Sequence, residues 1–140
     1  MGQRYVSFLV GENTYAIPLD EVVRIVPYGE VTQVPKALEF VEGVLNLHGE
    51  VVPILNMRER FGLPRDDTVQ RRRILVVRAG KRSYGFVVDS VREIVEIDEE
   101  NVERDASAIF GQRAKYTGGI AKLKDGLLVI LDPVSIVAAT

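Results

Sequence analysis

The sequence contains no cysteine and a single histidine among its 140 residues. Without a thiol the chain cannot form a disulfide, a thiolate nucleophile or a zinc–thiolate site, and one imidazole excludes a metal site built from several histidines. No apolar run approaches the ~18 residues of a membrane-spanning helix, and the first residues lack the apolar core of a signal peptide. We therefore expect a soluble cytoplasmic protein without cofactor, metal or membrane insertion.

Charge of one sign and reactive side chains are also scarce. The net charge is −2, with acidic and basic residues intermixed, which gives no basic surface for nucleic acid or an anionic membrane. The run Arg71-Arg72-Arg73 closes a polar stretch without aromatic residues, and we interpret it as part of a solvated linker. Neither a Gly-x-Ser-x-Gly motif nor a phosphate-binding glycine loop occurs. These absences disfavour an enzyme.

What the sequence does contain is a repeat. Residues 15–26 align with residues 84–95, and residues 43–56 align with 119–132 in the positions of their apolar residues. Two copies of about 70 residues are too few for a solenoid. We expect one domain, residues 1–140, with two similar lobes at approximately 1–70 and 71–140, and exchange of strands between the lobes stays open. The identical positions of the first pair are Tyr15/Tyr84, Asp20/Asp89, Val22/Val91, Ile25/Ile94 and Val26/Val95.

Strand patterns dominate both copies. Alternating or β-branched runs flank turns at residues 11–14 and 79–82, and later apolar pairs flank the tight turns at His48-Gly49 and Asp125-Gly126, which predicts four hairpins. Helices are short: Asn56 and Asp132 can each cap one, and further helical turns are expected at residues 35–40 and 105–110. Many short strands with frequent turns are typical of small β-barrels.

The repeated apolar residues also suggest a binding surface. Val22, Ile25 and Val26, with their counterparts in the second copy, carry more apolar surface than one face of a half-buried strand can hide. Some of them could line a groove between the lobes, and an apolar groove is how a small module binds an amphipathic helix. The alternative, that both sets belong to the core, stays open at each position.

A longer motif resembles a known family. The segment Phe40-Val-Glu-Gly-Val-Leu-Asn-Leu-His-Gly-Glu-Val-Val-Pro-Ile-Leu-Asn-Met-Arg, followed later by Tyr84-Gly-Phe-Val-Val-Asp-Ser-Val and Gly118-Gly-Ile-Ala-Lys-Leu, is similar to the CheW family of bacterial chemotaxis coupling proteins. The resemblance runs from about Arg4 to the end of the chain. It implies a mostly β fold with two five-stranded, Src-homology-three-like β-barrel lobes around a shared hydrophobic core and a few short helices.

The resemblance also implies a function. CheW-like proteins are non-enzymatic adaptors that couple the cytoplasmic tip of a methyl-accepting chemoreceptor to the regulatory domain of the histidine kinase CheA, in arrays at the inner face of the membrane. A small β-barrel module for a ligand or nucleic acid, and a CheW paralogue serving a different chemosensory array, are the alternatives. The kinase contact is expected at exposed ends of the second lobe. Carried over by position, the receptor-binding residues are Val22, Arg24, Gly43, His48, Val91 and Ile94.

Two of these positions depart from the family pattern. The chain has Asn-Leu-His-Gly, with His48, where the family typically has Asn-Leu-Arg-Gly, and it has Arg24 where many members have glutamate. The ion pair that the usual glutamate and arginine could make is therefore absent. Both positions are polar in either case, so the departures concern which receptor is bound and leave the expected fold unchanged.

Overall fold

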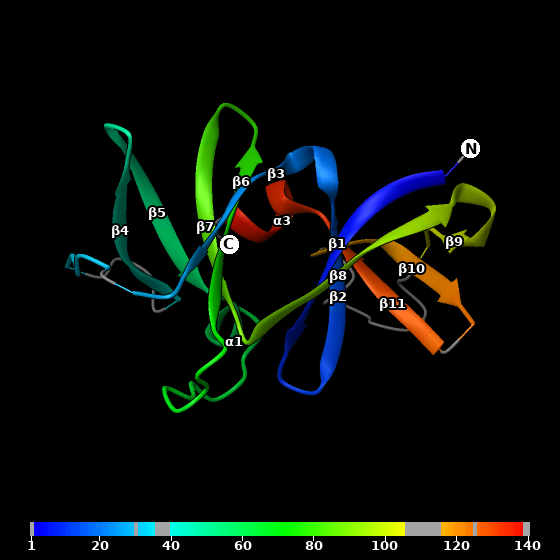
Figure 1. Ribbon diagram of the computed structural model, residues 1–140, viewed down its shortest axis with the longest axis horizontal. Coiled ribbons are helices and arrows are strands. Elements are labelled where there is room, and N and C mark those ends of the chain that lie inside the picture. The colour runs from blue at the N-terminus through cyan, green and yellow to red at the C-terminus, as the bar shows by residue number, and fades with distance from the viewer. Residues whose placement is uncertain (1, 30, 36–39, 106–115, 125, 139–140) are drawn as a thin grey trace.

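The computed structural model describes residues 2–29, 31–35, 40–105, 116–124 and 126–138 (Figure 1). The helical turns predicted at residues 35–40 and 105–110 fall mostly outside these ranges. Two antiparallel-rich sheets lie side by side, and short helices cover the region between them.

The first sheet has six strands and the second has five. In spatial order, the first contains β8 (Ser90–Asp98), β1 (Gly2–Val10), β2 (Asn13–Pro18), β11 (Gly126–Leu131), β10 (Thr117–Leu123) and β9 (Val102–Glu103). The second contains β3 (Val22–Pro27), β6 (Arg73–Ala79), β7 (Arg82–Val88), β5 (Glu50–Asn56) and β4 (Val41–Leu47). The helices are η1 (Leu19–Glu21), α1 (Met57–Arg60), η2 (Glu99–Asn101) and α3 (Pro133–Val137).

Each sheet combines strands from both halves of the chain. β1 and β2 join β8 to β11, whereas β6 and β7 join β3 to β5. The joints are two parallel pairs at equivalent places: Ala16 lies opposite Ile130, and Gly85 lies opposite Ile54. The sheets therefore do not coincide with residues 1–70 and 71–140, because the first two strands of each half have been exchanged.

The repeat is visible in the details of both halves. The prediction that Asn56 and Asp132 cap helices is confirmed: the Asn56 side chain accepts a hydrogen bond from the Glu59 amide at 3.1 Å, and that of Asp132 accepts one from the Val134 amide at 3.2 Å. These bonds satisfy amides that have no partner within the helix. The two halves thus end in the same way.

The predicted mostly β fold with two lobes and a few short helices is confirmed, and the strand order of neither sheet closes into a ring. The sixth strand of the first sheet is β9, which pairs with β10. Its counterpart in the second sheet is shorter, a single bridge between Thr32 and Val44 of β4.

The first hairpin turns are tighter than the sequence predicted. Asn13 already pairs with Val10, so the turn consists of Gly11 and Glu12 alone. Gly11 has a φ of 62°, and Gly80, in the equivalent turn of the second half, has a φ of 68°. Glycine adopts this left-handed conformation without a steric penalty, which allows the strands to reverse in so few residues.

Three apolar clusters fill the fold. The largest lies between the sheets and contains buried residues of both, including Phe8 of β1 and Phe86 of β7. The second is built around Tyr5 and Ile97 in the first sheet, and the third around Ile54 and Ile74 in the second. The large central cluster is the shared core that the sequence led us to expect, and the strands that border it carry the candidate site.

Candidate functional site

The predicted receptor-binding residues gather mainly on β3 and β8. Each of these strands lies at one edge of its sheet, and they are equivalent elements of the two halves (Figure 1). Val22 begins β3 and Val91 lies near the start of β8; both are half-buried and pack against the central cluster. The structure therefore brings these two predicted site residues to the same core, although they are far apart in sequence.

The three repeated apolar residues of each strand point in three directions. Val26 and Val95 pack against the clusters of their own sheets. Ile25 and Ile94 face solvent, with exposed fractions of 43% and 59%. An exposed isoleucine at the same place in each copy is the apolar surface that the sequence predicted, since large apolar side chains in solvent commonly mark partner sites.

A β-bulge at the same place in both strands produces this arrangement. The pairing of β3 with β6 shifts between Val22 and Arg24, and the pairing of β8 with β1 shifts between Ile94 and Val91. The extra residue in a bulge changes the side chains' direction and breaks the simple alternation of a strand. Val23, within the first bulge, is 58% exposed for this reason.

Gly43 lies below the surface. It sits in β4 next to another pairing shift, it is buried, and a Cβ atom on it would overlap the carbonyl oxygen of Thr32. Glycine is therefore needed for the close approach of two backbone segments. A role of Gly43 in receptor binding remains a prediction, and in this position it would act through its neighbours.

Arg24 and His48 are both exposed but lie on different elements. Arg24 is in β3 and His48 is in the turn between β4 and β5, and these strands stand at opposite ends of the strand order of the second sheet. Among the described residues, no hydrogen bond or ion pair involves either side chain. His48 has a φ of 50° and precedes Gly49, whose amide bonds to the Asn46 side chain at 3.0 Å. Histidine tolerates this conformation better than most residues, so His48 is suited to the turn itself.

An ion pair that the sequence did not predict fixes the start of β8. Arg58 of α1 bonds to the Asp89 carboxylate through Nε at 2.9 Å and Nη2 at 2.6 Å. The amide of Gly11 donates a further bond to Asp89 at 2.9 Å. One carboxylate thereby joins α1, the β1–β2 turn and the corner where β7 leads into β8.

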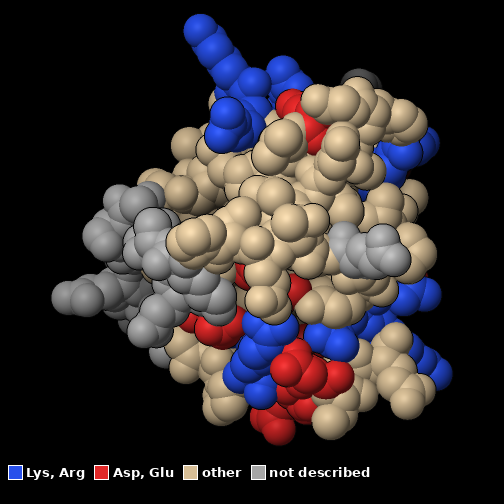
Figure 2. All heavy atoms as spheres, turned by 90° about the vertical axis from the view of Figure 1, so that its left-hand side faces the viewer, with Lys and Arg blue, Asp and Glu red and all other residues tan. Residues whose placement is uncertain are grey.

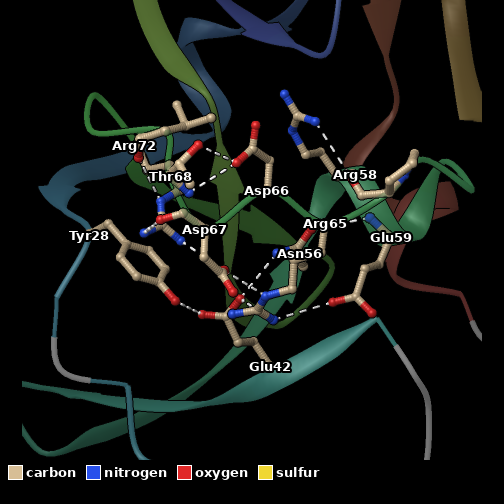
Figure 3. Close-up of polar contacts among 12 residues, drawn as sticks. Tyr28, Glu42, Asn56, Arg58, Glu59, Arg65, Asp66, Asp67, Thr68 and Arg72 are labelled. Atoms are coloured by element: carbon tan, nitrogen blue, oxygen red, sulfur yellow. Dashed lines mark hydrogen bonds and ion pairs between the residues drawn. The ribbon is translucent and has the colours of Figure 1, made fainter.

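A second polar cluster surrounds Glu42, a buried carboxylate in β4 (Figure 3). Tyr28 donates its hydroxyl to Glu42, Asn56 donates its side-chain amide at 3.1 Å, and Arg65 forms an ion pair at 3.1 Å. Burial, followed by the hydrogen bond to Glu42 and the negative charge of Glu42, raises the pKa of Tyr28 above its ordinary value. A buried carboxylate requires such partners, because an unpaired one is strongly destabilising.

The same cluster fastens the segment that joins the two halves. Arg65 also pairs with Glu59 at 3.3 Å and with Asp67 at 2.7 Å, and the guanidinium of Arg72 lies 4.0 Å from the ring centre of Tyr28 (Figure 3). The linker expected to be merely solvated is therefore held against the end of β3. One signal for this cluster was present: Glu42 is a lone charged residue in an apolar strand, where the second copy has glycine.

Apolar side chains are also exposed at the far ends of the molecule. Val51 and Leu127 occupy equivalent positions near the tips of the β4–β5 and β10–β11 hairpins and are 60% and 67% exposed. Figure 2 views the end that carries the β4–β5 hairpin: uncharged side chains fill its centre, with basic groups above and a mixture of acidic and basic groups below. Each end of the elongated molecule therefore offers an apolar tip.

Within the described ranges, no group of three or more His, Cys, Asp or Glu side chains could hold a metal ion. No helix in the same ranges is long and apolar enough to cross a membrane. The exposed features are apolar strands and hairpin tips, which suit contacts with other proteins.

Comparison with known proteins identifies the family. The model of the CheW-like domain matches residues 4–140. The chain belongs to the CheW family. It is 32% identical to the chemotaxis protein CheW of Helicobacter pylori over 128 residues, which cover 91% of this chain and 77% of that protein. It is also 32% identical to the chemotaxis protein CheW of Thermotoga maritima over 127 residues, which cover 90% of this chain and 82% of that protein.

A solved structure agrees with this assignment. The scaffolding protein TtCheW from Thermoanaerobacter tengcongensis superposes with a TM-score of 0.90 at 27% identity, covering 100% of this chain and 90% of that one. The resemblance noted in the sequence is therefore confirmed over the whole chain. The protein is a CheW-type chemotaxis scaffold and not an enzyme.

Proposed function

We propose that the chain couples the cytoplasmic helical tip of a methyl-accepting chemoreceptor to the regulatory domain of the histidine kinase CheA, on the cytoplasmic side of the membrane. The observation that carries the proposal is the pair of exposed isoleucines, Ile25 and Ile94, at equivalent places on the edge strands β3 and β8. They flank Val22 and Val91, which close the central core beneath them. An amphipathic receptor helix can cover such a surface with its apolar face.

The kinase contact belongs at a hairpin tip in this proposal. Leu123 and Leu127 expose apolar surface at the end of the β10–β11 hairpin, 38% and 67% respectively, and this hairpin lies at the opposite end of the molecule from the β4–β5 tip (Figure 1). Exposed ends in the second half were the expected place for this contact. Separate surfaces for the two partners would let one molecule hold both at once, which is what a coupling protein must do.

Two substitutions test the proposal, because each should weaken binding to a different partner. Ile94→Asp places a carboxylate where the receptor helix would desolvate it. The cost should be about 2 kcal/mol of binding free energy, which weakens the affinity for a receptor cytoplasmic fragment by about 30-fold. Leu127→Asp should weaken binding to the CheA regulatory domain and leave receptor binding unchanged. Co-sedimentation and calorimetry with each partner measure both. If each variant binds both partners as the wild type does, the assignment of the surfaces is wrong; if the wild type binds neither partner, the coupling function itself is wrong.

A further inference from the structure

A surface pocket of about 490 Å³ is lined by Arg71, Arg73, Ser90, Val91, Arg92 and Glu93. We call it the arginine pocket. Its guanidinium groups come from two segments some twenty residues apart in sequence. Arg73 begins β6 and Arg71 lies two residues before it, and the start of β8 supplies Arg92.

The fold brings these segments together through ordinary strand pairing. Arg73 lies opposite Val88, the last residue of β7, and the chain passes from there directly into β8. On its other side Arg73 lies opposite Pro27, at the end of β3. The pocket therefore lies where the start of β6 meets the start of β8, and Val91 belongs both to the pocket and to the proposed receptor surface.

The run of three arginines divides into two roles. Arg72 turns toward the linker, where it stacks on Tyr28 and bonds to the carbonyl oxygens of Asp67 and Val69. Arg71 and Arg73, on either side of it, line the pocket.

The pocket holds more positive charge than its own residues neutralise. Arg58, Arg65, Arg72 and Arg104 each form an ion pair with an aspartate or glutamate. By contrast, in the described part of the chain no ion pair joins Arg71, Arg73 or Arg92 to a carboxylate. Arg73 donates to the backbone carbonyls of Arg71 and Arg72 at 3.3 Å and 2.9 Å, so one of its nitrogens is held in place. Glu93 supplies a single negative charge against three positive ones.

We propose that the arginine pocket binds acidic side chains of the partner helix that lies on β3 and β8, and so selects receptors with carboxylates at that point. This inference rests on the proposed function. Guanidinium groups bind carboxylates through paired hydrogen bonds, and arginine is among the residues that contribute most at interfaces. The three arginines outweigh the single charge of Glu93, so the pocket attracts anions in general, and selection of a carboxylate side chain over phosphate rests on apolar contact that phosphate cannot make. Val91 offers apolar contact to the methylene groups of a glutamate.

The first test does not need a receptor. Hexaglutamate peptide and inorganic phosphate are titrated separately, at constant ionic strength, into the labelled full chain while the arginine Nε–Hε signals are followed by NMR. We expect hexaglutamate to shift the signals of Arg71 and Arg92, with smaller shifts from phosphate. Arg78 and Arg82, which are exposed in the β6–β7 hairpin, should not shift. Equal shifts at Arg78 and Arg82, no shift at any arginine, or larger pocket shifts with phosphate would each overturn the proposal.

The second test uses a receptor cytoplasmic fragment and matched charge reversals. Arg71→Glu with Arg92→Glu should weaken receptor binding by about tenfold or more and leave binding to the CheA regulatory domain unchanged. Changing the same two positions to glutamine should weaken receptor binding less than the change to glutamate does. The control pair, Arg78→Glu with Arg82→Glu, should bind as the wild type does, and circular dichroism checks that every variant is folded.

The outcomes separate the two proposals. If the pocket variant and the control pair bind the receptor equally well, the arginine pocket is not a receptor contact, while the coupling function stands. If the wild type binds no receptor fragment, the proposed function fails, and the peptide titration alone decides whether the pocket binds carboxylates.

Discussion

Arg58 and Asp89 form a two-point ion pair between α1 and the corner before β8, with Nε 2.9 Å from Oδ1 and Nη2 2.6 Å from Oδ2. The repeat does not preserve it. Asp20 is the counterpart of Asp89 in the first half, but the counterpart of Arg58 is Val134, which is 55% exposed. The ion pair therefore joins the two halves without a counterpart between Asp20 and Val134, and it positions a strand of the candidate site.

Removing one partner of this pair should destabilise the fold. Arg58→Gln leaves the Asp89 carboxylate, 10% exposed, without its cation, and we expect a loss of about 2–3 kcal/mol in the free energy of unfolding. Urea unfolding followed by circular dichroism measures this. Arg24→Gln, at an exposed arginine that pairs with no described residue, is the control and should change little. Equal stabilities of the two variants would show that the ion pair contributes nothing.

The two cap residues should tolerate different substitutions. Asn56 donates to buried Glu42 at 3.1 Å as well as capping α1, so Asn56→Asp keeps the cap but places a second carboxylate beside the first. We expect a loss of about 2 kcal/mol at pH 7 that becomes smaller in acid, where one of the two carboxylates is protonated. Asp132→Asn keeps a capping side chain and should change stability by only a few tenths of a kcal/mol. Thermal unfolding at pH 7 and pH 4 distinguishes the two, and a pH-independent loss for Asn56→Asp would contradict the explanation.

Val22 and Ile94 should respond differently to the same change. Val22 packs on the central cluster, so Val22→Asp should lower the free energy of unfolding by at least about 2 kcal/mol. Ile94 is 59% exposed, so Ile94→Asp should change stability by less than about 0.5 kcal/mol. Unfolding in urea tests both without a partner protein. If both variants remain equally stable, Val22 belongs to the exposed surface and not to the core.

Glu21 predicts a dependence of stability on pH. Burial, followed by repulsion from Asp132 and Asp20, raises the pKa of Glu21 above its ordinary value of 4.5, and its Oε2 atom is buried without a hydrogen-bond partner. A pKa raised by folding means that ionisation is harder in the folded state, so stability present below pH 4.5 is lost as the pH rises through the folded value.

Glu21→Gln should therefore be more stable than the wild type at pH 7, and the difference should disappear as the pH falls below 4.5. The gain should be modest because the side chain is partly exposed to solvent. Chemical unfolding across this pH range measures it, with Glu12→Gln in the exposed β1–β2 turn as control. A Glu21→Gln variant no more stable than the wild type at pH 7 would contradict the account.

The features that could be predicted from the sequence are those that repeat. Asn56 and Asp132 were recognisable as caps because each follows an apolar strand and precedes a short helix, and Gly80 matched Gly11 at a turn. Each of these depends on a few neighbouring residues, whose local conformational preferences are strong.

The exchange of strands could not be predicted in this way. β1 and β6 have similar patterns, so each could lie beside β3 or beside β8. Only the complete packing selects the observed arrangement, in which β1 lies beside β8 and β6 lies beside β3. The arginine pocket and the Glu42 cluster depend on that arrangement, since Arg73 meets β8, and Arg65 meets β4, only in the folded chain. Whether Arg24 and His48 lie close together likewise depends on the arrangement of the strands, which no short motif encodes.

The parallel pairing of β2 with β11 has a consequence for synthesis on the ribosome. β2 ends at Pro18, and β11 begins at Gly126. The edge of β2 that pairs with β11 therefore stays unpaired while roughly 110 further residues are synthesised. At about 5–20 residues per second, this hairpin remains without its neighbour for about 5–20 s in every cell that makes the protein. During that time its unpaired edge is open to other nascent chains, which makes the emerging β1–β2 hairpin the part of this protein with most need of a chaperone.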